Sequence, residues 1–170
     1  MHDHFKMFAA YNAWANQRLY EAAGKLDDGQ WLRDCGAFFG SMQRTLNHLL
    51  VTDRIWLRRF TGEGPAHAGL DEVPFEGFVE LRNAREAEDR RIIAFVDGLS
   101  PDMLAGPFTY MPVTNPVPVT QKRSPALAHL FNHQTHHRGQ AHVILTSLGQ
   151  AAPSLDLIYF QRSPEGAAWA

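Results

Sequence analysis

The stretch SPALAHLFNHQTHHRGQAHVILTSLG, from Ser124 to Gly149, decides how this chain is expected to fold. It opens with a serine that suits a helix N-cap and a proline that suits the first helical position, and it ends at a glycine, a residue that often follows a helix. Its apolar residues recur on one helical stripe, which consists of Ala126, Leu130, Ala141, Ile144 and Leu148. The stretch therefore predicts one long amphipathic helix.

His133 and His137 lie on this apolar stripe, where a core leucine would be expected. Residues four apart on a helix have side chains about 5–6 Å apart, so two imidazoles at this spacing can reach one metal ion. A single inward histidine is more often a hydrogen-bonded core residue, but two on one turn both need polar partners, and a shared cation satisfies both. Surface histidines are the chief alternative interpretation, because His129, His136 and His142 fall off the stripe.

The same spacing carries the two zinc histidines of the HExxH metalloproteases, in which a glutamate follows the first histidine. Gln134 occupies that position here. Because the glutamate base of that motif is absent, the sequence excludes this class of protease.

A third metal ligand has to come from another helix, and His48 and Asp53 are the two candidates. His48 lies on a partly apolar face, about 130° from the strongest apolar stripe of its helix. Asp53 is equally compatible with a surface acid or with a partner of a ligand histidine. The spacing alone therefore leaves the third ligand open.

Three further helices follow from apolar periodicity and from the residues that begin and end helices. They are expected over about 3–23, 41–60 and 75–98. With the last helix they predict an all-α four-helix bundle, in which the long connection between the second and third helices leaves room for a crossover. Two short β-prone stretches, Phe108–Met111 and Val117–Thr120, predict a small hairpin-like excursion before the last helix.

The composition is that of a globular protein, with 45% hydrophobic and 20% charged residues. The length of 170 residues favours a single domain over residues 1–170. The net charge of −2 and the lack of Lys/Arg runs argue against nucleic acid as a partner. We expect no signal peptide, no membrane span and a cytoplasmic protein, because no long apolar run is present and the only cysteine, Cys35, cannot form an internal disulfide.

Four segments carry a resemblance to a known family, and the run from His133 to Gln140 is the most specific part of it. The segments are Tyr11–Asn16, Thr45–Leu50 with Asp53 and Trp56, Phe131–Gln140, and Pro153–Tyr159. In them the chain resembles the DinB (damage-inducible) family of metal-dependent bundles, which is related to YfiT-like proteins and thiol-dependent S-transferases. The resemblance implies a four-helix bundle with a long crossover, and His48, His133 and His137 as the metal ligands.

Three neutral imidazoles leave at least one coordination position open, as in catalytic rather than closed structural sites. Zinc, nickel or iron would accept this ligand set. The resemblance implies a small-molecule substrate, in particular a low-molecular-weight thiol, and a homodimer. We therefore expect a metal-dependent S-transferase or hydrolase; the alternative is a non-catalytic, metal-stabilised bundle that acts as a sensor or binding module.

Ligand histidines usually donate their second N–H to a carboxylate or a carbonyl. The candidates for this supporting role, each of which can equally be structural, are Asn47, Asp53 and Gln134. His136 is either a proton shuttle or a plain surface residue. The helical spacing of Tyr11 and Trp14 indicates that they pack in the core, or that they form a pocket wall if the first helix lines the metal.

Overall fold

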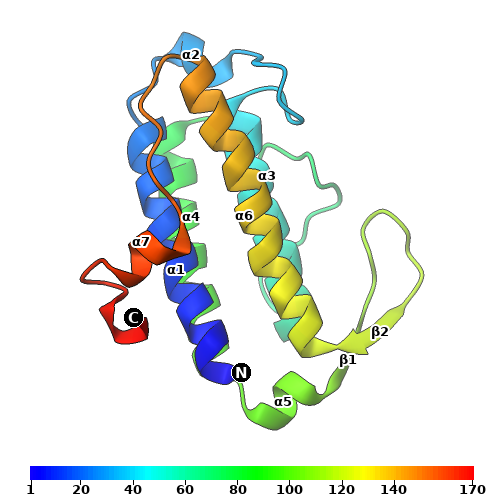
Figure 1. The fold of residues 1–170 in the computed structure, drawn as a ribbon. Helices are drawn as coiled ribbons and strands as arrows, with labels where there is room; N and C mark the ends of the chain where they lie inside the picture. The colour runs from blue at the N-terminus through cyan, green and yellow to red at the C-terminus, as the bar shows by residue number, and fades with distance from the viewer.

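The computed structural model describes residues 1–170 and contains four long helices that form a bundle (Figure 1). These are α1 (His2–Ala23), α3 (Met42–Thr61), α4 (Phe78–Asp97) and α6 (Arg123–Ser147). Shorter elements lie in the connections and in the C-terminal segment: α2 (Asp28–Leu32), α5 (Pro101–Ala105), α7 (Leu157–Gln161) and the 3₁₀ helix η1 (Ala167–Trp169). The predicted all-α bundle is confirmed.

The order of the bundle includes the crossover that the long second connection had suggested. In Figure 1, α1 and α6 run upwards, whereas α3 and α4 both run downwards. α1 packs against α4 and α6, and α3 packs against the same two helices. Residues 62–77 therefore return along the length of the bundle, which makes α3 and α4 parallel. At the far end of α4, His2 lies 2.8 Å from the carbonyl oxygen of Val96.

The helix boundaries differ from the expected ones by a few residues, for local reasons. The helix expected from residue 75 begins at Phe78, because the backbone N–H and C=O of Phe75 are both hydrogen-bonded to the Asn47 side chain. The last helix begins at Arg123, directly after a strand, so Ser124 is not its N-cap. Pro125 still falls in the first turn, where a backbone N–H has no intrahelical partner.

The predicted hairpin is present, with its second strand shifted. β1 (Pro107–Tyr110) pairs antiparallel with β2 (Val119–Lys122), so that Tyr110 lies opposite Val119. The expected stretch 117–120 begins two residues too early. Pro118 lies inside that stretch, and proline has no N–H to donate to a strand partner, so pairing begins after it.

The bundle core consists of two apolar halves separated by a polar layer. One half surrounds Leu19, Leu46 and Ile144, and the other surrounds Leu57 and Leu130. Between them the four long helices contribute buried polar side chains, which are Asn12, Asn16, Asp53, Arg85, Asp89, Gln134 and Arg138. This layer lies directly beside the histidine-bearing part of α3 and α6.

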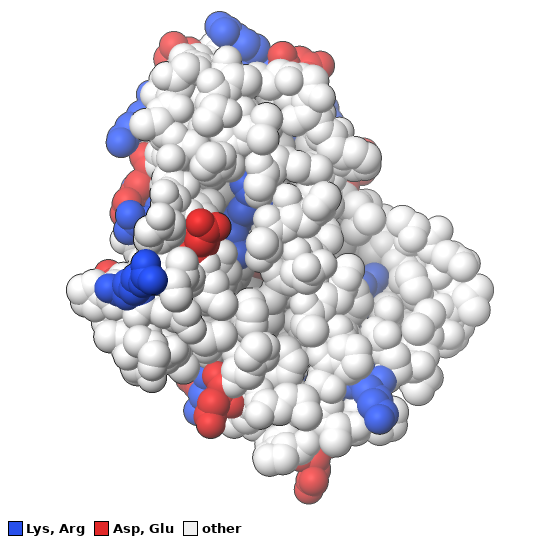
Figure 2. Space-filling view, in the orientation of Figure 1, with Lys and Arg blue, Asp and Glu red and all other residues white.

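No helix of the protein has the length and apolar character that a membrane crossing requires. On the face shown in Figure 2, basic and acidic groups are scattered among uncharged residues and form no extended basic patch.

Candidate metal centre

Three histidines from two helices meet at one point on the side of the bundle. His48 comes from α3, and His133 and His137 come from successive turns of α6. One ligand atom from each ring can be chosen so that all three lie within 4.8 Å of one another. The ring centroids are 4.3 Å apart for His133 and His137, and 4.4 Å apart for His48 and His137. The three residues therefore form a group that could hold one metal ion, as expected.

The crossover segment accounts for the position of His48, which the helical wheel had left doubtful. Only 3% of its surface is exposed, although it lies far from the main apolar stripe of α3. The segment 62–77 covers this second face of the helix, and its Leu70 carbonyl oxygen lies 2.7 Å from His48 Nδ1. Phe39, from the loop before α3, stacks on the other side of the ring with centroids 3.9 Å apart.

The hydrogen bonds fix the tautomers of two of the three rings. A carbonyl oxygen can only accept, so His48 donates its Nδ1–H to Leu70 and its Nε2 carries a lone pair. His137 Nδ1 lies 2.8 Å from Gln140 Oε1, which accepts in the same way. In the neutral rings, both Nε2 atoms are then acceptors.

These two acceptors face each other, with His48 Nε2 3.2 Å from His137 Nε2. Two lone pairs at this distance cannot form a hydrogen bond, whereas a cation between them satisfies both. A tetrahedral zinc ion with Zn–N bonds of about 2.0–2.1 Å places its ligand nitrogens about 3.3 Å apart. The geometry of the pair therefore fits a shared divalent ion.

Burial favours the neutral, metal-binding form of all three imidazoles. It lowers the pKa of His48 to about 4, with the Leu70 carbonyl opposing the shift. It lowers the pKa of His133 to about 3, helped by the neighbouring histidines, and it also lowers the pKa of His137. Neutral imidazole is the form that donates a lone pair to a metal.

A pocket of about 570 Å³ opens beside the three rings. Its other walls come from the loop before α3, from the crossover segment and from the hairpin loop, through Phe38, Phe39, Leu70, Asp71, Val113 and Thr114 among others. Asp71 is the only carboxylate that lines it. Phe38 lies at the mouth with 80% of its surface exposed. The pocket gives a small molecule access to the histidines.

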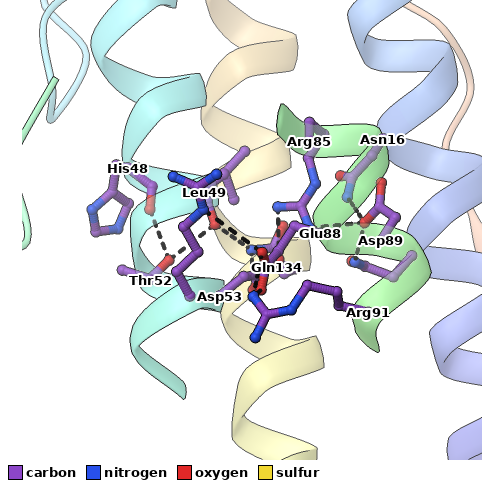
Figure 3. A network of polar contacts seen from close by, with 12 residues as sticks. Asn16, His48, Leu49, Thr52, Asp53, Arg85, Glu88, Asp89, Arg91 and Gln134 are labelled. Atoms are coloured by element: carbon purple, nitrogen blue, oxygen red, sulfur yellow. Dashed lines mark hydrogen bonds and ion pairs between the residues drawn. The ribbon is translucent and has the colours of Figure 1, made fainter. Parts of the chain in front are cut away.

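The residues expected to support the ligand histidines have other partners. Asn47 binds the backbone of Phe75 and holds the crossover segment. Gln134 donates to Asp53 Oδ1 at 2.6 Å and to the Leu49 carbonyl at 2.9 Å. In Figure 3 this network lies on one side of α3 and the ring of His48 points away from it. None of the three candidates forms a hydrogen bond with a ring of the triad.

Asp53, the competing candidate for the third ligand, is part of the polar layer instead. Its Oδ2 lies 2.7 Å from Arg85, which also binds Asp89 at 2.9 Å. Burial raises the pKa of Asp53 to about 7, and Arg85 opposes this rise. A carboxylate committed to a buried arginine is not free to bind a metal.

The groups that sequence reasoning missed are Leu70, Asp71, Phe39 and Gln140. Gln140 follows His137 by three residues, so helical spacing alone could have indicated that contact. The others lie in loops, where no periodicity signals which side chain or carbonyl approaches α3. His136 is exposed and packs edge-on against His137.

Tyr11 and Trp14 belong to the core rather than to the pocket wall. Both pack against Phe160 of α7, and the Tyr11 hydroxyl donates to the Leu155 carbonyl at 2.6 Å. The C-terminal segment is thereby held on α1, away from the triad.

Comparisons with known proteins agree with this architecture. The chain is 27% identical over 160 residues to the protein DinB of Bacillus subtilis, covering 89% of this chain and 90% of that protein. A crystal structure of a DinB-like protein from Bacillus cereus superposes with a TM-score of 0.64 at 17% identity, over 83% of this chain and 90% of that one, and so supports the fold. The model of the DinB family matches residues 1–167, and the chain therefore belongs to the DinB family.

Proposed function

We propose that the protein is a metal-dependent enzyme that acts on a small molecule, with a low-molecular-weight thiol as the leading substrate class and hydrolysis as the alternative chemistry. The observation that carries the proposal is the pair of facing Nε2 lone pairs of His48 and His137, 3.2 Å apart beside an open pocket. Three histidine ligands with one accessible position are typical of catalytic rather than structural sites.

The proposed ligands are His48, His133 and His137, and the ion is zinc, nickel or iron. When bound, such an ion supplies a Lewis acid that favours the thiolate over the thiol, or hydroxide over water, near neutral pH. The softness of a thiolate suits zinc in particular.

The protein's own groups orient the ligands and line the space where a substrate would lie. Leu70 and Gln140 hold two of the rings at their Nδ1 atoms, which directs both Nε2 atoms towards one point. Asp71 is the one carboxylate beside the triad, and we assign it the role of accepting the proton from the incoming thiol or water. Phe38 and Phe39 provide an apolar wall for the body of the substrate.

The test begins with metal analysis of protein purified without an affinity tag, followed by a screen for transfer of thiols to electrophilic substrates. His133→Ala is expected to lose both the metal and turnover while keeping its helical circular dichroism. His142→Ala, on the same helix but outside the triad, is the matched control and should keep both.

Asp71→Asn separates catalysis from metal binding. We expect it to retain the metal and to lose about 10²–10⁴-fold in turnover, the usual contribution of a positioned proton acceptor. Asp28→Asn, an exposed acid on α2, controls for the change in charge.

A non-catalytic, metal-stabilised bundle makes the opposite prediction. Chelation would then lower the melting temperature sharply, and no thiol or ester substrate would be turned over by the metal-loaded protein. If substitution of all three histidines left the bound metal unchanged, the assignment of the site would be wrong.

A further inference from the structure

A second pocket, of about 270 Å³, lies next to α3 on the side of the hairpin. It is bounded by α3, by the crossover segment and by β1 with the loop that follows it. Its lining includes Ile55, Arg58, Arg59, His67, Tyr110 and Val113, and none of its ten residues is acidic. Among its basic side chains His67 is bonded to Glu72 at 2.6 Å, whereas Arg58 and Arg59 have no acidic partner, and these two arginines distinguish the pocket from the one at the triad.

Arg59 is the central feature of this pocket. Its guanidinium lies over the ring of Trp56 at 4.5 Å and over the ring of Tyr110 at 4.7 Å, so aromatic faces hold it in place. The side chain is half-buried, and burial lowers its pKa. Its guanidinium nevertheless forms no ion pair and no hydrogen bond within the protein.

Other buried or half-buried arginines of the protein do have polar partners. Arg85 is paired with two aspartates, Arg54 is paired with Glu88, and Arg138 donates to the Asn16 side chain. A buried or half-buried cation is costly without a partner. Arg59 thus has its planar fork fixed by aromatic rings and its N–H groups free, an arrangement suited to bidentate binding of a carboxylate or phosphate.

We propose that this pocket binds a small organic acid whose carboxylate or phosphate is held by Arg59 and whose apolar body lies against Ile55, Met111 and Val113. Arg58 adds a second positive charge at the rim, where its guanidinium donates to the Gly64 carbonyl at 2.5 Å. The proposal goes beyond the metal chemistry and does not depend on it.

The position of the pocket links it to the triad. Val113 lines both pockets, so a bound acid lies beside the space in front of the histidines. Arg59 follows His48 by 11 residues on α3, which corresponds to about 16 Å along the helix axis. A ligand in the second pocket is therefore a neighbour of the metal centre and not a ligand of the metal.

The test is a calorimetric titration of the 170-residue chain with hexanoate and with hexyl phosphate, which carry the two acids on the same apolar body. Hexanol is the uncharged control ligand. Both anions are expected to bind, and Arg59→Gln should weaken both by about tenfold or more, because bonds to charged groups are lost. Arg59→Lys keeps the positive charge but loses the planar guanidinium, so its affinity for both anions should lie between that of the unmodified protein and that of Arg59→Gln. Arg162→Gln removes an exposed charge elsewhere and should bind like the unmodified protein.

The same titration in His133→Ala distinguishes this pocket from the metal. Anion binding that survives in His133→Ala and still depends on Arg59 supports the proposal. Binding that disappears in His133→Ala and is unaffected by Arg59→Gln would place the anion on the metal and overturn it. Equal binding of hexanol, or folded Arg59 variants that bind like the unmodified protein, would overturn it as well.

Discussion

At the scale of single residues, the orientation of each histidine ring depends on the partner of its other nitrogen. Leu70 and Gln140 occupy the Nδ1 atoms of His48 and His137, and this leaves both Nε2 atoms as acceptors that face each other. His133 forms no hydrogen bond within the protein and packs against the rings of His48 and His137. Orientation before binding is what raises the affinity of a metal site.

Gln140→Ala is expected to lower metal affinity by about 10–100-fold, the usual effect of removing a group that holds a ligand histidine. His137 would then be free to rotate or to change tautomer. Because Gln140 is only half-buried, we expect little loss of stability from the substitution. Affinity would be measured by competition with a chromogenic chelator. Gln17→Ala, which removes an exposed glutamine bonded to Glu21, is the control. Equal affinity in both variants would contradict this role for Gln140.

The sequence identifies the three histidines through spacing and resemblance, but it does not identify what holds them. The i, i+4 relation of His133 and His137 is a property of one helix, and a helical wheel describes it correctly. Leu70 acts through its backbone carbonyl, a group that every residue carries. No sequence pattern distinguishes the one carbonyl that comes to lie against His48.

At the scale of elements, α3 differs from an ordinary surface helix because it is covered on two faces. Its main apolar stripe faces the bundle core, and the crossover segment covers the opposite side, so that twelve of its residues are buried. A helical wheel that assumes one buried face therefore underestimates the burial of the His48 side chain. The ends of the four long helices were predictable to within a few residues, whereas the path of residues 62–77 was not, because it has no periodicity.

Asn47→Ala tests whether this segment positions the site. The Asn47 side chain is fully buried, donates to Phe75 and Gln43 carbonyls at 2.9 Å, and accepts from the Phe75 N–H at 3.1 Å. Its loss leaves the half-buried N–H and C=O of Phe75 without this partner, so the free energy of unfolding should fall by about 1–3 kcal/mol. Metal affinity should fall too, because Leu70 lies in the released segment.

Urea unfolding and limited proteolysis of residues 62–77 would measure these effects. The control is Gln43→Ala, which removes a hydrogen bond to the carbonyl of Glu76 in the same segment but at an exposed position. It should change stability by no more than about 0.5 kcal/mol. Resistance of Asn47→Ala to proteolysis would show that the segment is held by other contacts.

At the scale of the whole molecule, the polar layer joins all four long helices. Arg85 of α4 binds Asp53 of α3 and Asp89 of its own helix, while Asn16 of α1 donates to Asp89 at 3.0 Å (Figure 3). Arg138 of α6 donates to Asn16 at 3.2 Å. From the sequence, Asp53 is a candidate metal ligand, a partner of a ligand histidine or a surface acid, and its pairing with Arg85 is not predictable, because complementary charges on different helices carry no signal at any fixed spacing.

Arg85→Met is expected to lower the free energy of unfolding by about 3–5 kcal/mol at neutral pH, because two buried carboxylates lose their cation. Burial already raises the pKa of Asp53 and of Asp89, and Arg85 opposes both shifts. In the variant both folded-state pKa values rise further above the unfolded value of about 3.9. The loss of stability should therefore shrink as the pH falls towards about 4 and grow as it rises through the folded pKa values.

Urea unfolding of the variant and the unmodified protein across this pH range gives the measurement. Arg82→Met is the control, since Arg82 forms an exposed ion pair with Glu86 that should contribute no more than about 0.5 kcal/mol at any pH. If the loss of unfolding free energy in Arg85→Met did not vary with pH, the two aspartates would not be the groups that lose a partner.

The polar layer has a consequence for how the helices align along their axes. The apolar halves on either side of it would tolerate a helix displaced by one turn, about 5.4 Å, since leucine and isoleucine would meet similar neighbours. A slip of α4 would carry the guanidinium of Arg85, together with Asp89 on the same helix, away from Asp53 of α3 and into hydrocarbon. The charged layer thus favours one alignment of α4 against α3. The hydrogen bond from Gln134 to Asp53 favours one alignment of α6 against α3, and this sets the level at which the histidines of the two helices meet.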